Sequence, residues 1–493
     1  MSCQHIYFKN RITFIFFEKI DKQRLIIFIF PVFVLHMPVL PIDSGRYGSR
    51  EIKQIFEEEN RLHYQLELEA AVAMAQAKIK IIPSDASDEI VKVTKSGRIR
   101  VDRIKELEQI SDHDTAALVE ALSEQCSDKT KPWIHYGLTS NDVVDTATSM
   151  QLRDALNIVE PKIIKLAIAL VNRAIEFRSQ PAVGRTHGQH SSIMSFGLKF
   201  AVWALELAKH IERIEEGRKR FLLCKTLGVV GTGSLMGESA LEVQRQVASY
   251  LSLHAVDAAT QVIPRERYAE VQFLIALIGS TLDKIAIEIR NLQRTEIGEV
   301  AEPFRKGQMG SSAVPVKRNP IKSERISSLA RILRSEVDVA MENIPLWHER
   351  DLSNSANERF IIPMSMIILD EMLNLMINII SELTINIERI TSNLDMTKGQ
   401  IYAEFVLEAL IKKGIPRLEA YRNIQRIAFS SHENRQYFYE AIKKDSAISQ
   451  VLSSEELKSI FDARNHLSAS TKIIDNVSKI VEGIHKSFFH PGI

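Results

Sequence analysis

The chain has 493 residues, of which 45% are hydrophobic and 25% are charged, so it can bury a large core and is expected to fold into two or three domains. Its 63 basic and 62 acidic residues leave a net charge of +1, which argues against binding to nucleic acid or stable association with a membrane, and an acidic ligand must therefore be held by a few placed cations. Cys3, Cys126 and Cys224 lie far apart without a CxxC pair, which supports neither a disulfide framework nor a thiolate metal site and fits a reducing cytoplasm.

Residues 1–36 differ from the rest of the chain. Two apolar bursts, 14–17 and 25–35, are separated by charged residues, and neither reaches the ~20 apolar residues that a membrane-spanning helix needs. His36-Met37-Pro38 is not a signal-peptide cleavage site. We interpret residues 1–36 as a non-native or disordered extension and Met37 as the start of the mature protein. A weak tether to a membrane surface is the alternative.

An N-terminal helical domain is predicted over residues 37–142. Residues 50–82 are charged and helical, Pro83 ends that stretch, and a second helical stretch runs from about residue 101 toward His113.

The segment 135–142, His-Tyr-Gly-Leu-Thr-Ser-Asn-Asp, lies where a long helix is predicted to begin. Thr139, Ser140 and Asn141 offer hydroxyl and amide donors there, and helix N-termini present free N–H groups, so the segment is a natural seat for an anion. The alternative is a helix cap without a ligand, and that interpretation is strong for Asp142.

Past residue 142 the pattern changes to long amphipathic helices, which few glycines and prolines (20 and 15) also favour. In residues 274–292 apolar side chains recur at three- and four-residue steps over about five turns. Similar stripes cover 144–178, 195–222, 321–342 and 360–392. Helices of ~30 residues run about 45 Å and usually form bundles with other subunits, so a central bundle domain is predicted over 143–390. Shorter helices form a C-terminal domain over 391–493.

Three breaks between the predicted long helices carry candidate chemistry. In Gly184-Arg185-Thr186-His187-Gly188-Gln189 an imidazole among small neighbours could act as a general acid, although a lone histidine is more often structural and His190 adds only a second ligand for a metal. Gly228, Gly231, Gly233 and Gly237 are spaced wrongly for a dinucleotide fingerprint and predict a tight loop near the active centre.

The third break, residues 310–320, combines small residues, two serines, a lysine and an asparagine. Backbone N–H groups, Lys317 and Asn319 could together cover an anion such as a carboxylate, and two prolines prevent a helix. The alternative is a plain surface turn.

This loop resembles the signature loop of the fumarase/aspartase superfamily, with Val314 where that superfamily usually has methionine. Three further segments resemble the adenylosuccinate lyase family within it: 132–142, 184–190 and 345–359, the last beginning Pro-Leu-Trp-His-Glu-Arg-Asp-Leu-Ser-Asn-Ser. The resemblance runs from about Met37 to the C-terminal domain. It implies an all-α, three-domain fold whose central long-helix bundle assembles into a tetrameric core.

The resemblance also implies a cytoplasmic C–N lyase of purine biosynthesis. Members of the family eliminate fumarate from adenylosuccinate, giving AMP, and from SAICAR, giving AICAR, in homotetramers whose active sites are shared between subunits. No metal or cofactor is needed. The alternatives are another fumarate-releasing lyase, such as argininosuccinate lyase, or a non-catalytic structural relative.

Carried over by position, the family's roles make Ser311 the base and His187 the general acid, with Glu324 bonded to His187. His113 is the second candidate for the general acid. Lys317, Asn319, Thr139 and Ser140 would hold the carboxylates of the fumarate half. The phosphate, ribose and base of the nucleotide would be bound by His113, His135, Arg46, Tyr47, Gln261, Arg350, Ser355 and Arg359. Asp112 stands where some relatives carry a basic residue, which puts a phosphate contact from that position in doubt.

Overall fold

The structure is a computed structural model that describes residues 3–8, 11–20, 24–33 and 40–489. The chain divides into two compact units, Met1–Gly48 and Ser49–Ile493. In the first unit, strands β1 (Cys3–Phe8), β2 (Arg11–Ile20) and β3 (Arg24–Phe33) form an antiparallel sheet in that order. The phenylalanines and isoleucines of both apolar bursts favour such strands. That residues 1–36 are a non-native or disordered extension stays a prediction.

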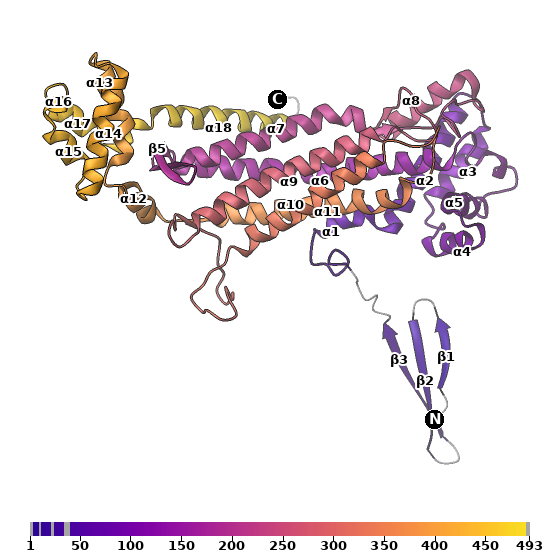
Figure 1. Cartoon of the computed structure of the whole chain (residues 1–493). Coiled ribbons are helices and arrows are strands. Elements are labelled where there is room, and N and C mark those ends of the chain that lie inside the picture. Colours follow the sequence, from indigo (N-terminus) through magenta and orange to yellow (C-terminus); the bar gives the residue numbers. More distant parts are fainter. Residues whose placement is uncertain (1–2, 9–10, 21–23, 34–39, 490–493) are drawn as a thin grey trace. The chain divides into compact units, whose positions relative to one another are not determined.

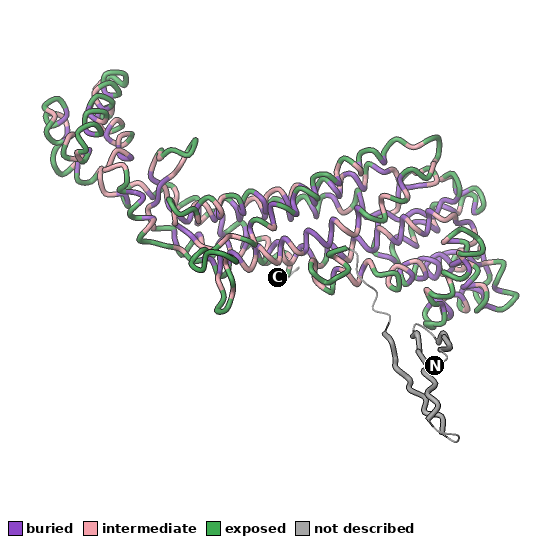
Figure 2. Tube along the Cα trace, turned by 60° about the horizontal axis from the view of Figure 1, so that its bottom comes forward, coloured by how far each residue is buried: buried purple, intermediate pink, exposed green. Residues whose placement is uncertain are grey.

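The second unit is built on five long helices, α6 (Ser140–Glu176), α7 (Gly197–Phe221), α9 (Glu266–Leu292), α10 (Ile321–Glu342) and α11 (Ser355–Glu382). They lie side by side, and their facing sides carry the buried residues (Figures 1 and 2). The all-α class is confirmed, and each of the five predicted helical stretches contains one of these long helices. The stretch 360–392 is wrong in its extent, because α11 ends at Glu382 and a short strand follows at Thr384–Ile385. The last helix, α18 (Ser468–Phe489), packs along α6 and α7, so part of the predicted C-terminal domain adds to the bundle.

The segment before the bundle is helical: α1 (Arg50–Phe56), α2 (Glu58–Lys78), α3 (Ser84–Thr94), α4 (Val101–Ser111) and α5 (Asp114–Ser123). Small side chains such as Ala70, Ala71 and Ala73 let α2 pack closely on α3 and α6. Helices α2 to α5 gather at one end of the bundle, where α8 (Ala240–Tyr250) also contacts α2, whereas α1 lies against α6 and α11 (Figure 1).

Shorter helices follow the bundle at its opposite end: α12 (Ile387–Asp395), α13 (Ala403–Lys412), α14 (Arg417–Glu433), α15 (Phe438–Lys444), α16 (Ser446–Ser449) and α17 (Ser454–Ile460) (Figure 1). They share a core of their own that includes Val406, Ile424 and Phe438. The predicted domain boundaries at residues 142 and 390 stay predictions.

Short strands connect some of the helices, and the sequence pattern did not reveal them. β4 (Pro181–Thr186) pairs antiparallel with β5 (Gln189–Ser195), while β6 (Leu223–Cys224) pairs with β7 (His254–Ala255) and β8 (Val300–Ala301) with β9 (Thr384–Ile385). The predicted break around His187 is therefore a hairpin. His187 and Gly188 form its two-residue turn, and both have positive φ, +53° and +74°, as the tightest hairpin turns require.

Helix α11 is the one described helix with the length and apolar composition to cross a membrane. Most of its apolar stretch is buried against the rest of the second unit. This burial accounts for its composition, since core helices of this kind are apolar nearly all round.

Candidate active site

A pocket of about 380 Å³ lies where α6 and α11 begin, beside the loop that joins α4 to α5. It brings together six residues that the sequence singled out: His113, Ser140, Asn141, Arg350, Ser355 and Arg359. These residues are up to 246 positions apart in the chain, since the pocket joins segments that follow α4, open α6 and open α11. The motifs of the N-terminal domain and of residues 345–359 therefore meet in one place.

Positive charge in the pocket comes from arginines. Arg359 bonds Asp114 at 2.8 Å, and Arg61, which the sequence analysis did not identify, approaches the same carboxylate oxygen at 3.6 Å. Burial would raise the pKa of Asp114, but the charges of Arg359 and Arg61 outweigh it and hold that pKa below its usual value. Asp114 therefore stays ionised and fixes both guanidinium groups at the pocket.

Arg350 has a side-chain donor that no described residue accepts. Its Nη1 donates to Gln261 Oε1 at 2.8 Å, which joins two predicted nucleotide-binding residues. Its Nε is buried and has no hydrogen-bond partner among the described residues. Burial lowers the pKa of Arg350. A buried, unpaired guanidinium N–H is costly, and an anionic ligand would satisfy it.

Arg265 also lines the pocket, but it serves the fold. It is buried, donates to both carboxylate oxygens of Asp145 at 2.9 Å and lies 3.0 Å from Glu358. Burial raises the pKa of Glu358 to about 6. Since two carboxyl groups surround Arg265, its charge is already compensated, and Arg350 and Arg359 are better placed to bind an anion.

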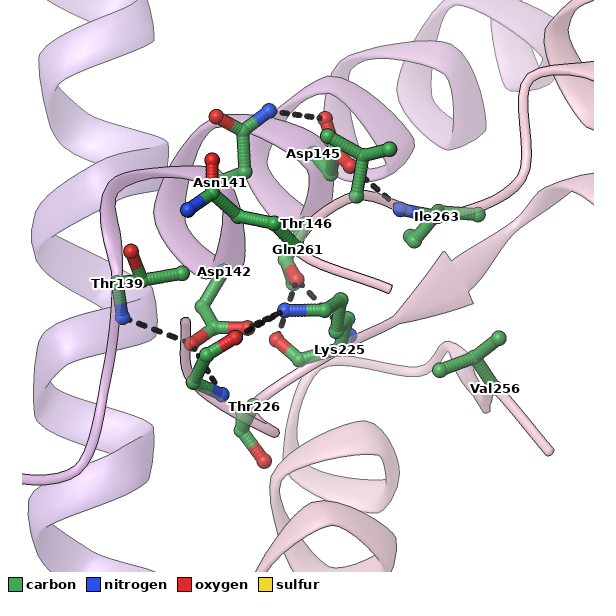
Figure 3. Close-up of polar contacts among 12 residues, drawn as sticks. Thr139, Asn141, Asp142, Asp145, Thr146, Lys225, Thr226, Val256, Gln261 and Ile263 are labelled. Atoms are coloured by element: carbon green, nitrogen blue, oxygen red, sulfur yellow. Dashed lines mark hydrogen bonds and ion pairs between the residues drawn. The ribbon is translucent and has the colours of Figure 1, made fainter. Parts of the chain in front are cut away.

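The start of α6 is held by a buried network that the sequence analysis missed (Figure 3). Asp142 accepts hydrogen bonds from Thr139 N at 2.8 Å and from Gly228 N at 3.0 Å, and it pairs with Lys225. The side chains of Asp142 and Lys225 are both fully buried. Asp142 is thus more than the helix cap expected for it, because it ties the segment 139–141 to the glycine-rich loop.

That glycine-rich loop is as tight as the sequence predicted. A Cβ on Gly231 would lie 2.0 Å from the carbonyl oxygen of Ala259, and one on Gly233 would lie 2.4 Å from Cβ of Ala240. Both glycines have positive φ. Only glycine allows the backbone to pack this closely.

Two histidines lie near the start of α6. The ring Nδ1 of His113 accepts from Ala116 N at 3.2 Å and caps α5, so a neutral ring carries its proton on Nε2. The ring Nδ1 of His135 is 2.7 Å from Glu69 Oε1, and Glu69 is buried. Burial would lower the pKa of His135, but the charge of Glu69 and its hydrogen bond outweigh burial and raise it.

The other predicted catalytic residues lie elsewhere in the second unit. Ser311, Lys317 and Asn319 belong to the loop 302–320, which joins β8 to α10, and Ser311 Oγ accepts from Ala313 N at 3.3 Å and Val314 N at 3.1 Å. The loop closes tightly, because a Cβ on Gly310 would lie 2.0 Å from the carbonyl oxygen of Lys317. It projects from the bundle end that also carries β5 (Figure 1).

His187 and Glu324, which the resemblance joins by a hydrogen bond, are both exposed, and the described residues show no bond between them. Arg185, two residues before His187, pairs with buried Glu299, which precedes β8. The hairpin and the end of α9 therefore lie at the same end of the bundle, away from the pocket.

The length of the helices separates the two sets of residues. Arg265, at the start of α9, lines the pocket, whereas Gln293, directly after α9, donates to the carbonyl of Arg318 at 2.9 Å. The 27 residues of α9 span about 40 Å. One chain thus does not bring Ser311 to Arg350. Arg46 and Tyr47 belong to the first compact unit.

Known proteins match this chain over most of its length. Residues 45–333 match the lyase family model, and residues 399–477 match the model for the adenylosuccinate lyase C-terminus. The chain is 40% identical to an adenylosuccinate lyase of Methanocaldococcus jannaschii over 447 residues, covering 90% of this chain and 96% of that protein. It is 41% identical to the one from Pyrococcus abyssi over 450 residues, covering 91% and 99%.

Solved structures resemble the fold as well. A fumarate lyase from a Mesorhizobium species superposes with a TM-score of 0.80 and 29% identity, covering 88% of this chain and 98% of that one. A 3-carboxy-cis,cis-muconate lactonizing enzyme from Pseudomonas putida superposes with a TM-score of 0.81 and 25% identity, covering 90% and 100%.

Proposed function

Since the chain belongs to the adenylosuccinate lyase family, we propose that it eliminates fumarate from adenylosuccinate and releases AMP, and that it releases fumarate from SAICAR in the same way. Both substrates carry a succinyl group on nitrogen and a phosphate at the other end. The site must therefore hold two carboxylates and a phosphate and move one proton at each side of the C–N bond.

The pocket suits the phosphate end of the substrate. The unpaired, buried Nε of Arg350 is the observation that carries this assignment, and Arg359 and Ser355 at the start of α11 lie beside it. A guanidinium fork and a helix N-terminus both favour a phosphate. His113 and Gln261 complete the proposed nucleotide site in the second unit. The roles predicted for Arg46 and Tyr47 stay predictions.

The elimination itself needs a base, an acid and donors for the carboxylates. Ser311 removes the proton from the succinyl carbon next to the one that carries nitrogen, the electron pair forms the double bond of fumarate, and the C–N bond breaks. His187 gives the departing purine nitrogen a proton, with Glu324 holding its ring. Lys317, Asn319, Thr139 and Ser140 stabilise the carboxylate that shares the carbanion's charge.

These residues require more than one chain. Because α9 holds the pocket and the Ser311 loop about 40 Å apart, the site is completed by other subunits of a homotetramer. Exposed apolar side chains on the bundle support this assembly, among them Phe273, which is 57% exposed, Val202 and Ile287. We assign the enzyme to the cytoplasm, where Cys126 and Cys224 would stay reduced.

An ultraviolet assay tests the proposal directly. The purified chain should consume adenylosuccinate and release fumarate and AMP in equal amounts, and it should leave argininosuccinate unchanged. Turnover of argininosuccinate but not of adenylosuccinate would assign a different lyase. A folded, oligomeric protein that acts on neither would be a non-catalytic relative.

A further inference from the structure

Two side chains of helix α2 form hydrogen bonds with the turn that precedes α6. Glu69 bonds the ring of His135 at 2.7 Å, and Gln76 Nε2 donates to the carbonyl of Tyr136 at 2.7 Å. The two residues are seven positions apart, which places them on one face of α2. His135 itself has φ +57°, a left-handed conformation that is unfavourable for a residue with a Cβ. The fold therefore holds this imidazole in one place against a conformational cost.

Glu69 has no evident role in folding α2. It lies between Leu68 and Ala70 in a run of buried small and apolar residues, and only 2% of its side chain is exposed. A buried carboxylate costs stability unless a cation or several donors compensate it. His135 is its one hydrogen-bond partner among the described residues. The pair is thus a dyad in which the ring supplies the compensation.

The dyad leaves one ring nitrogen of His135 for a ligand. Because Glu69 accepts from Nδ1–H, the remaining donor is Nε2–H. Nε2 makes no hydrogen bond to a described residue. It is not buried either, and 18% of the His135 side chain is exposed. Thr139 and Ser140, the proposed seat for an anion, follow four and five residues later.

The charged groups around His135 all favour its protonated form. Glu69 faces it from α2 and Asp142 from α6, and Asp142 is already paired with Lys225. Glu69 is therefore the negative charge that balances a protonated His135.

We propose that Glu69 is a positioning residue for the reaction: it fixes the ring of His135 and places a negative charge beside it, so that His135 Nε2–H donates to an oxyanion of the substrate beside Thr139. The inference rests on the proposed function for the identity of that substrate. The oxyanion is either the phosphate or a succinyl carboxylate. Both are recognised by the same cationic donor.

The variant that isolates the charge is Glu69→Gln, and the matched control is Glu67→Gln, which removes an exposed charge from the same helix. The first readout is the titration of His135 in the free enzyme, followed by NMR with isotopically labelled histidine and assigned with His135→Gln. Glu69→Gln should lower the midpoint of the His135 titration, and Glu67→Gln should leave it unchanged. This measurement does not depend on any activity.

The second readout is the pH profile of kcat/KM for adenylosuccinate. In the wild type kcat/KM should fall when His135 loses its proton, and in Glu69→Gln that fall should begin at lower pH. At about pH 7.5 the variant should lose about tenfold in kcat/KM. In a His135→Gln background the same substitution should add no further loss. Titrations with AMP and with fumarate then distinguish the sources, because only the ligand that bears the contacted oxyanion should bind more weakly.

An unchanged His135 titration in Glu69→Gln overturns the proposal, as does a shifted titration with an unchanged pH profile. If Glu69→Gln does not fold, Glu69→Asp serves instead: it keeps the charge, so it should retain the wild-type direction of the titration, and a midpoint as low as that of free histidine would contradict the dyad. A wild type that shows the dyad by NMR but does not consume adenylosuccinate would refute the proposed function and leave the dyad intact.

Discussion

Ser311 has the most demanding role among the proposed catalytic residues, because a serine hydroxyl is a poor base unless its alkoxide is stabilised. Two backbone N–H groups, those of Ala313 and Val314, already point at its Oγ. Such donors favour a negatively charged oxygen. The tight closure at Gly310 keeps this arrangement within one short loop.

We expect Ser311→Ala to abolish turnover while substrate binding stays within about tenfold, because the hydroxyl transfers a proton and does not anchor the substrate. Steady-state kinetics at saturating adenylosuccinate and equilibrium binding measure the two effects. Ser312→Ala is the control, since Ser312 is an exposed neighbour in the same loop. Near-normal turnover in Ser311→Ala would remove Ser311 as the base.

At the scale of single residues, the sequence identified several residues that line the pocket but not the buried residues that hold them in place. Arg350 and Arg359 were identified because they stand in the recognisable segment 345–359, and His113 by its position in the family, and the structure brings the three together. Glu69 and Lys225 were missed. Each has its partner far along the chain, 66 and 83 residues away, so neither helical periodicity nor spacing could link the pair. A lysine within the apolar run 221–227 was the available signal.

Among the elements, the start of α6 depends on the ion pair of Asp142 and Lys225. We expect Lys225→Met to destabilise the protein by about 3–5 kcal/mol, because it leaves a buried carboxylate without its cation. Denaturant unfolding measures this loss. Adding Asp142→Asn in the same chain should recover part of it. If the double variant is less stable than Lys225→Met, the stability of this region does not come from the pair.

The bundle itself contains a carboxyl group that is expected to be neutral. Ser365 Oγ lies 2.6 Å from both Gln272 Oε1 and the carbonyl of Ile361, and it also bonds buried Glu336. One hydroxyl proton cannot serve three acceptors, and a protonated Glu336 would relieve this conflict in part by donating to Ser365 Oγ. Burial raises the pKa of Glu336 to about 7, in agreement with this count.

This group should make stability depend on pH. Because the folded pKa of Glu336 is raised, its contribution is fully present below the unfolded pKa and is lost as pH rises through about 7. Glu336→Gln should therefore be more stable than the wild type at about pH 8, by on the order of 2–3 kcal/mol, with a smaller gap at about pH 5. Thermal unfolding across this range is the measurement. Glu342→Gln, an exposed change on the same helix, should show no such trend, and an equal trend in both variants would contradict the assignment.

For the whole molecule, the periodic apolar stripes were enough to predict the five long helices and the all-α class, since each stripe repeats over many turns. The hairpin at His187 was not predicted, because its strands are short and its turn is His-Gly instead of a common turn pair. Spacing along the sequence also could not show which motifs lie at the same end of the bundle, because their positions depend on how helices of different length pack together.

The separation of the two sets of residues leads to a test by complementation. An Arg350→Ala/Arg359→Ala protein and a Ser311→Ala protein, mixed and allowed to exchange subunits, should regain up to about a quarter of wild-type activity at low substrate, because random assembly leaves that share of sites with both parts intact. Each parent, taken through the same exchange alone, is the control. Mixed tetramers, seen by native mass spectrometry, that show no gain over the parents would rule out shared sites.

The 40 Å between the pocket and the Ser311 loop also bears on how damage to this protein is inherited. If each active site is formed by residues of different chains, a chain with one defective motif inactivates only the site to which it contributes that motif. In a cell that makes sound and defective chains together, activity then declines in simple proportion to the defective share, and such a mutation behaves as recessive. A mutation that disturbs packing along the bundle also affects the intact chains that assemble with the mutant chain. Dominant mutations are therefore expected in these long helices.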